Sequence, residues 1–248
     1  MRISELSTRS GVAIATIKYY LREGLLHQGE QVAATRAEYD GSHLRRLRLI
    51  RALLEVGRLP VAAIKQVVEA VEDETLPIHR VLGTAHYALG PAVEPEPGEP
   101  WEEALAETDR LIAGQGWTIT PHAPTRAELA QTLLTLRRLG MSTDLTRYAE
   151  AARRIARDDM DVIPFDEPRE SAVEALVLGT VLYGRALDTL RRMAHESESA
   201  HRLGLVPGDA PAGGAPAGDA ATREPRAAGD AAPREDRTAE EDRSGPTG

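Results

Sequence analysis

Apolar residues recur every three or four positions through most of this chain, which is the spacing of one buried helix face. The spacing predicts helices over residues 3–10, 14–24 and 42–56, then one from Val61 and another of about a dozen residues after Pro77. In the helix over 42–56, Ser42 is the expected cap and Gly57 with Pro60 the expected stop. Aromatic residues make up only 4% of the chain. We therefore expect an all-α fold, in which helices pack on helices.

A stretch rich in proline, glycine and glutamate, GPAVEPEPGEP, follows over residues 90–100 and predicts a linker. A second helical region is expected over 101–205. Within it, Thr125 and Glu128 have the three-residue spacing of a capping box. Pro168 should begin the longest helix, which runs to about residue 200. The expected buried side of that helix carries Val173, Leu176, Val177, Leu187, Leu190 and Met193.

The last segment, residues 206–248, has a different composition. From Pro207 onward it holds six prolines and seven glycines among alternating charges, without an aromatic residue or any Ile, Leu, Val or Met. Such a segment buries too little apolar surface to offset the entropy lost on ordering. We expect it to be a disordered tail.

The net charge of −9 is unevenly distributed along the chain. Residues 1–60 hold ten Lys or Arg against six Asp or Glu, a net charge of +4, whereas residues 61–248 have a net charge of −13. Charges act within a Debye length of about 8–10 Å, so the basic N-terminal region can attract phosphates although the whole chain is acidic.

Several classes of protein are disfavoured by what the sequence lacks. Without cysteine, disulfides, thiolate metal sites and cysteine nucleophiles are excluded. Neither a signal peptide nor an apolar run of about 20 residues is present, so we expect a cytoplasmic protein with no membrane span. No Ser-His-Asp, paired-carboxylate or phosphate-loop pattern indicates an enzyme or a cofactor. The seven histidines show no HxxxH or HExxH spacing, and the nearest cluster, around His195 and His201, does not predict a metal site.

The stretch ISELSTRSGVAIATIKYYLREGLL, followed by TRAEYDGSHLRRLRLIRALLEVGRLPVAAIKQVV, resembles the MerR family of bacterial transcription regulators. The resemblance covers residues 1 to about 72 and implies a winged helix-turn-helix DNA-binding domain. TIKYYLREGLL matches the recognition helix, and Tyr39 with Asp40 matches the end of a wing over residues 27–39. Beyond the part that resembles the family, we expect the helix over 73–90 to be a connecting or dimerisation helix, residues 91–100 to be the linker, and the helical region over 101–205 to be a sensor or dimerisation domain.

In such a domain the second helix enters the major groove, so the resemblance implies which residues contact DNA. These are Arg2, Ala15, Thr16, Lys18, Tyr19, Tyr20, Arg22, Arg36, Tyr39 and Arg45. Three positions depart from the family pattern. Lys18 replaces the usual arginine and lacks its planar fork, Ala13 replaces a capping Ser or Thr, and Gln31 replaces a wing arginine. Arg36 is the only cation in the wing range.

The family also implies a mechanism and partners. Its members bind double-stranded promoter DNA as homodimers, and they bend and untwist an overlong spacer so that RNA polymerase can engage both promoter elements.

A small organic effector is the expected signal, with Tyr87, Trp117, Tyr148 and Tyr183 as candidate contacts. Gly179 and Gly184 in the long helix predict a close helix crossing or a ligand approach. The alternatives are a ligand-independent repressor or accessory DNA-binding protein, and a protein-interaction module that keeps the fold without binding DNA.

Overall fold

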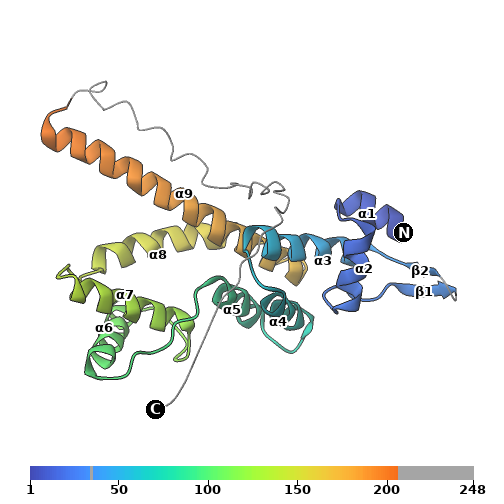
Figure 1. Ribbon diagram of the computed structural model, residues 1–248, viewed down its shortest axis with the longest axis horizontal. Helices are drawn as coiled ribbons and strands as arrows, with labels where there is room; N and C mark the ends of the chain where they lie inside the picture. The colour runs from blue at the N-terminus through green and yellow to red at the C-terminus, as the bar shows by residue number, and fades with distance from the viewer. Residues whose placement is uncertain (34–35, 206–248) are drawn as a thin grey trace, which may run out of the picture. The chain divides into compact units, whose positions relative to one another are not determined.

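The structure is a computed structural model, and it describes residues 1–33 and 36–205. The tail predicted over 206–248 lies outside the described residues. The described chain is mostly helical, and Figure 1 shows its elements coloured from blue at the N-terminus to orange in α9. No helix in this part of the chain is both long and apolar enough to cross a membrane.

The first five elements form a helix-turn-helix followed by a hairpin and a third helix. They are α1 (Ile3–Ser10), α2 (Ile14–Arg22), β1 (Glu30–Ala33), β2 (Arg36–Glu38) and α3 (Gly41–Arg51). Gly11 ends α1 with a φ of 70°, which glycine adopts without strain, and its N–H donates to Ser7 O at 2.9 Å. Ala13 caps α2 without a side-chain hydrogen bond, as the missing Ser or Thr predicts. The hairpin β1–β2 is antiparallel and occupies the range expected for the wing.

The start of α3 corrects one prediction, because Asp40, and not Ser42, is the N-cap. The Asp40 side chain accepts from the backbone N–H groups of Ser42 and His43, and the His43 ring accepts from the Asp40 N–H in return. A carboxylate accepts these N–H bonds more strongly than a hydroxyl and suits the positive end of the helix dipole. After α3, one π-helical turn (Ala52–Val56) continues the helix to Gly57.

One core joins the N-terminal elements to two later helices and to the beginning of the longest helix. These are α4 (Val61–Glu72), α5 (Ile78–Leu89) and α9 (Arg169–Leu203). Leu47, Leu53, Val67, Val81 and Val173 are all completely buried in this core. The first turns of α9 therefore pack in the same core as the helix-turn-helix.

The second half of α9 was predicted wrongly. Val173, Leu176 and Val177 are buried as expected, but Leu187, Leu190 and Met193 are 47–60% exposed. The apolar spacing continues along the helix, but these three side chains remain largely exposed in the described chain. Gly184 has no atom within 4 Å of an added Cβ, and Gly179 meets only the Tyr183 ring, so the predicted close helix crossing is absent from the described chain.

A smaller core forms between α6 (Glu99–Gln115) and α7 (Pro124–Arg138), and α8 (Thr146–Asp161) follows them. Trp101, Ala104 and Leu133 are buried there. The predicted capping box at Thr125 and Glu128 does not form, because α7 begins two residues earlier than a cap at Thr125 requires, with Ala123 at the N-cap and Pro124 at the first helical position. Proline is favoured at that position because it has no N–H to leave unpaired.

Candidate nucleic-acid interface

Helix α2 has one face in the core and the opposite face in solvent. Ile17 is completely buried and Tyr20 is 6% exposed, which fixes the orientation of the helix. Ala15, Lys18 and Arg22 are exposed on the other side at spacings of three and four residues. No carboxylate among the described residues forms an ion pair with Lys18 or Arg22. The exposed face of α2 is therefore a short, positively charged strip.

Two further residues predicted to contact DNA lie on α2 beside this strip, and a third lies at the start of α1. Thr16 and Tyr19 are half-buried, and the Arg22 guanidinium lies 5.8 Å from the centroid of the Tyr19 ring. This cation–π contact holds the Arg22 side chain along the surface of α2. Arg2 is exposed at the N-cap of α1.

Two predicted contact residues are largely inaccessible instead. Tyr20 and Tyr39 are only 6% and 8% exposed and belong to the core. Burial, followed by the nearby Glu55 carboxylate, raises the pKa of Tyr20, so its hydroxyl stays protonated. By packing in the core, the two tyrosine rings hold α2 and the end of the hairpin in place, and they are not part of the exposed face. The resemblance identified these positions but could not distinguish a buried ring from an exposed one.

The hairpin holds its single cation in an internal ion pair. Arg36 Nη2 lies 2.7 Å from Glu38 Oε1, and both side chains are about half exposed. Glu30 lies directly opposite Glu38 in the register of the two strands, so the hairpin carries two carboxylates close together. The carboxylates reduce the attraction of this element for phosphate, beyond the effect of Gln31 in place of arginine.

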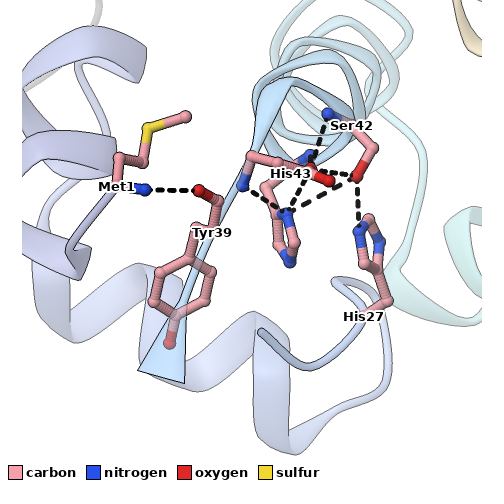
Figure 2. A network of polar contacts seen from close by, with 6 residues as sticks. Met1, His27, Tyr39, Ser42 and His43 are labelled. Atoms are coloured by element: carbon pink, nitrogen blue, oxygen red, sulfur yellow. Dashed lines mark hydrogen bonds and ion pairs between the residues drawn. The ribbon is translucent and has the colours of Figure 1, made fainter. Parts of the chain in front are cut away.

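The chain's first residue anchors the exit of the hairpin. The Met1 amino group donates to Tyr39 O at 2.7 Å, and the Tyr39 N–H donates to Met1 O at 2.8 Å. Figure 2 shows Met1 and Tyr39 side by side at this point. The pair fixes the end of β2 next to the start of α1.

The four arginines of α3, at positions 45, 46, 48 and 51, differ in their exposure. Arg46 is 2% exposed, and its guanidinium contacts Glu72 of α4 at 2.7 Å and Glu170 of α9 at 3.5 Å. Arg51 pairs with Glu55, while Arg45, the predicted phosphate contact, is half-buried. Arg46 therefore connects the helix after the hairpin to the base of α9, a contact across 124 residues that sequence spacing could not reveal.

A polar cluster lies at the base of the hairpin, where residues before β1 meet residues after β2 (Figure 2). The His27 and His43 rings have centroids 3.9 Å apart. His27 Nε2 lies 2.9 Å from Ser42 Oγ, and His43 Nδ1 lies 2.8 Å from Asp40 Oδ1. Hydrogen bonds from Ser42 and then His43 hold the pKa of the Asp40 carboxyl far below its ordinary value. Burial, then the neighbouring His43 and Arg46, lowers the pKa of His27.

The four aromatic residues proposed as effector contacts do not converge on one site. Tyr183 lines a pocket of about 330 Å³ bounded by α8, α9 and His86 of α5, and Trp117 lines a separate hollow beside Arg153. The Tyr87 hydroxyl lies 2.8 Å from the Thr120 hydroxyl, and the Tyr148 ring lies under Arg191 at 5.4 Å. Only Tyr183 borders the more enclosed pocket, whose lining is mainly apolar.

Comparisons with known proteins agree with this arrangement. Residues 1–71 match the family model described as MerR HTH family regulatory protein. The solved structure of SCO5550, a proposed transcriptional regulator from Streptomyces coelicolor A3(2), is 39% identical in sequence, with a TM-score of 0.63. The match covers 84% of this chain and 100% of that one, so it extends well beyond the helix-turn-helix. No curated protein is significantly similar to the chain. The chain belongs to the MerR family of helix-turn-helix regulatory proteins.

Proposed function

We propose that this DNA-binding regulator places α2 in the major groove of promoter DNA and the hairpin β1–β2, acting as the wing, against the flanking backbone. The exposed face of α2 carries the proposal, because Lys18 and Arg22 lie on it without acidic partners while Ile17 anchors the opposite face. An ammonium lacks the fork that reads guanine, so Lys18 contributes mainly by contacting phosphate. Distortion of the DNA between the two half-sites then supplies part of the specificity. In this proposal the chain catalyses no reaction.

The regulator acts as a homodimer whose seam includes the second half of α9. Tyr183, Leu187, Leu190 and Met193 are 47–60% exposed along this helix, a run of large apolar side chains that a lone chain leaves in water. Apolar residues spaced three and four apart are typical of helices that pair with one another. A dimer also presents two copies of α2 to two half-sites, which is how helix-turn-helix proteins read a duplex.

A small, largely apolar effector is proposed to bind in the pocket lined by Tyr183, Met160 and Ile163. Residues of α9 form one wall of this pocket, and the same helix begins in the core of the DNA-binding region. The contact of Arg46 with Glu170 joins the base of α9 to α3. Binding in the pocket therefore has a physical connection to the hairpin and α2. RNA polymerase is the partner that responds to the distorted promoter.

Footprinting of the purified protein on the promoter upstream of its own gene tests this proposal. We expect protection of an overlong spacer and enhanced reactivity of its central bases, which would change when cell extract supplies the effector. Identical footprints with and without extract would favour a ligand-independent repressor. No protection at about micromolar protein in low salt would contradict DNA binding, since non-specific phosphate contacts alone are strong there.

A further inference from the structure

The pocket lined by Tyr183 is not closed by the chain that forms it. Met160, Val162, Leu182 and Tyr183 all line this pocket of about 330 Å³, yet each of these side chains is 37–62% exposed. Binding pockets for small apolar molecules normally bury most of the ligand's surface. A ligand bound here would keep one side in water unless a further element covers it.

One face of α9 both lines this pocket and continues beyond it. Residues that repeat every seven positions, with a spacing of three within each repeat, form a stripe along one side of a helix. On α9 this stripe consists of Leu176, Gly179, Tyr183, Ala186, Leu190 and Met193. The first three of these residues line the pocket, and the last three lie beyond it on the same face. The pocket wall and the exposed apolar face are therefore two halves of one continuous surface, the α9 stripe.

We propose that a second copy of this chain covers the open side of the pocket with its own α9 stripe, so that the effector site is complete only in the dimer. Leu176 is 3% exposed and already packs within its own chain, which leaves the later half of the stripe available to a partner. In a two-fold dimer with antiparallel α9 helices, the later half of each stripe meets the pocket half of the other. The small residues Gly179 and Ala186 leave room for the partner's Leu190 and a bound ligand.

The later half of the α9 stripe is large enough for such a contact. Four large side chains on and beside it are 47–60% exposed, namely Tyr183, Leu187, Leu190 and Met193. They leave an apolar patch on the order of 500 Å² per chain, so two patches approach the roughly 1,200 Å² of a small specific interface.

Charge favours the same partner. Along this part of α9 the charged residues lie off the stripe, where Asp188 pairs with Arg192 at 3.3 Å. An uncharged stripe fits another apolar helix face, and an identical chain supplies one of matching length. Ligand binding and dimer formation then strengthen each other by the same factor, because the two equilibria share one site.

The uncharged apolar dye Nile red, titrated into the full-length protein and followed by fluorescence, tests the shared site without DNA. We expect the dimeric wild type to bind one dye per chain. Leu187→Glu combined with Leu190→Glu should give a monomer that binds the dye at least about tenfold more weakly, although neither residue lines the pocket of its own chain. Sedimentation velocity measures the oligomeric state of each protein, and circular dichroism checks that it is folded.

Two glycines of α9 provide a matched pair of variants. Gly179→Leu fills the pocket wall and should abolish dye binding while the protein remains a dimer, since leucine suits a helix-pairing stripe. Gly184→Leu adds the same side chain off the stripe, where an added Cβ meets nothing within 4 Å, and should bind the dye as the wild type does. Unchanged binding by Gly179→Leu would show that the dye lies elsewhere and would overturn the site.

The inference rests on the proposed effector pocket and α9 seam, but it can fail separately from them. A monomeric double variant that binds Nile red as tightly as the wild type would show that the pocket is complete within one chain. Dimerisation, the effector pocket and DNA binding would then all stand without a shared site. A wild type that is monomeric at tens of micromolar protein, or a dimer that binds no dye, would also overturn the inference, whereas the footprint tests DNA binding independently.

Discussion

At the scale of single residues, the DNA-binding face depends on how charges are paired. Lys18 and Arg22 are exposed without acidic partners, Arg36 is paired within the hairpin, and Arg46 is buried between Glu72 and Glu170. The sequence shows all four as cations of one basic segment. Their different roles follow from three-dimensional contacts, so a count of basic residues overestimates the charge that DNA can meet.

The first prediction concerns Lys18. Replacing it with alanine should lower specific promoter affinity by about 1–3 kcal/mol, because an exposed ammonium on the recognition face is lost. The fold should be unaffected, since the side chain is exposed. Fluorescence anisotropy with a labelled promoter duplex measures the effect, and an unchanged affinity would remove Lys18 from the interface.

Removing a negative charge from the hairpin should instead raise the affinity for the promoter. Glu38→Gln removes the carboxylate that pairs with Arg36 at 2.7 Å and leaves the guanidinium free for phosphate. The surface ion pair itself contributes little to stability, about 0–1 kcal/mol, so the hairpin should persist. We expect promoter affinity to rise by roughly two- to tenfold at low salt. Glu150→Gln, an equal change of charge on exposed α8, is the control, and equal affinities for the two variants would place the hairpin away from DNA.

At the scale of elements, the hairpin is held by close backbone packing. An added Cβ on Gly29 would lie 2.6 Å from Glu38 O and 3.0 Å from the Tyr39 ring, closer than real Cβ atoms approach a carbonyl oxygen. Gly29→Ala should therefore displace β2 and destabilise the protein by about 1–3 kcal/mol, with weaker DNA binding.

Gly83→Ala is the matched control, because an added Cβ there meets nothing within 4 Å and lies in the interior of α5. This change should stabilise by about 0.5–1 kcal/mol. Urea unfolding of the two variants provides the measurement. If Gly29→Ala unfolds at the same urea concentration as the wild type, the hairpin is not held as tightly as described.

Helices were the part of the fold that apolar spacing could predict, because each of them buries one face. Apolar spacing predicted the first residue of each helix less well. Ser42 and Thr125 were expected as caps, but Asp40 and Ala123 occupy those positions. A cap depends on local competition among neighbouring residues, which the hydrophobic pattern does not report. The cluster of His27 with His43 was also missed, since the two residues meet only when the hairpin returns the chain.

At the scale of the whole molecule, α9 connects the proposed functions. Its first turns pack beside the helix-turn-helix, its middle lines the pocket at Tyr183, and the exposed Leu187 and Leu190 follow. The repeat of apolar residues predicted a buried side along the entire helix. It could not distinguish burial within one chain from burial against a second chain, which is why Leu187 and Leu190 were misplaced.

The prediction at this scale is that charge on α9 breaks the dimer. Leu187→Glu combined with Leu190→Glu should give a monomer in sedimentation velocity experiments, because two carboxylates would be buried in an apolar seam. Leu139→Glu changes a leucine that is 69% exposed outside α9, and it should leave the dimer intact. A double variant that still sediments as a dimer would contradict the proposed seam.

The salt dependence of promoter binding tests most directly whether α2 meets the DNA backbone. The plot of log K against log salt has a negative slope, and its magnitude decreases by about 0.9 for each phosphate contact that is lost. In a dimer each substitution removes the contact from both subunits. Combined Lys18→Gln and Arg22→Gln should therefore reduce the slope by roughly 3 to 4. Arg154→Gln with Arg157→Gln, the same loss of charge on exposed α8, should leave the slope at its wild-type value. Equal slopes for the α2 variant and the wild type would show that Lys18 and Arg22 do not contact DNA phosphates.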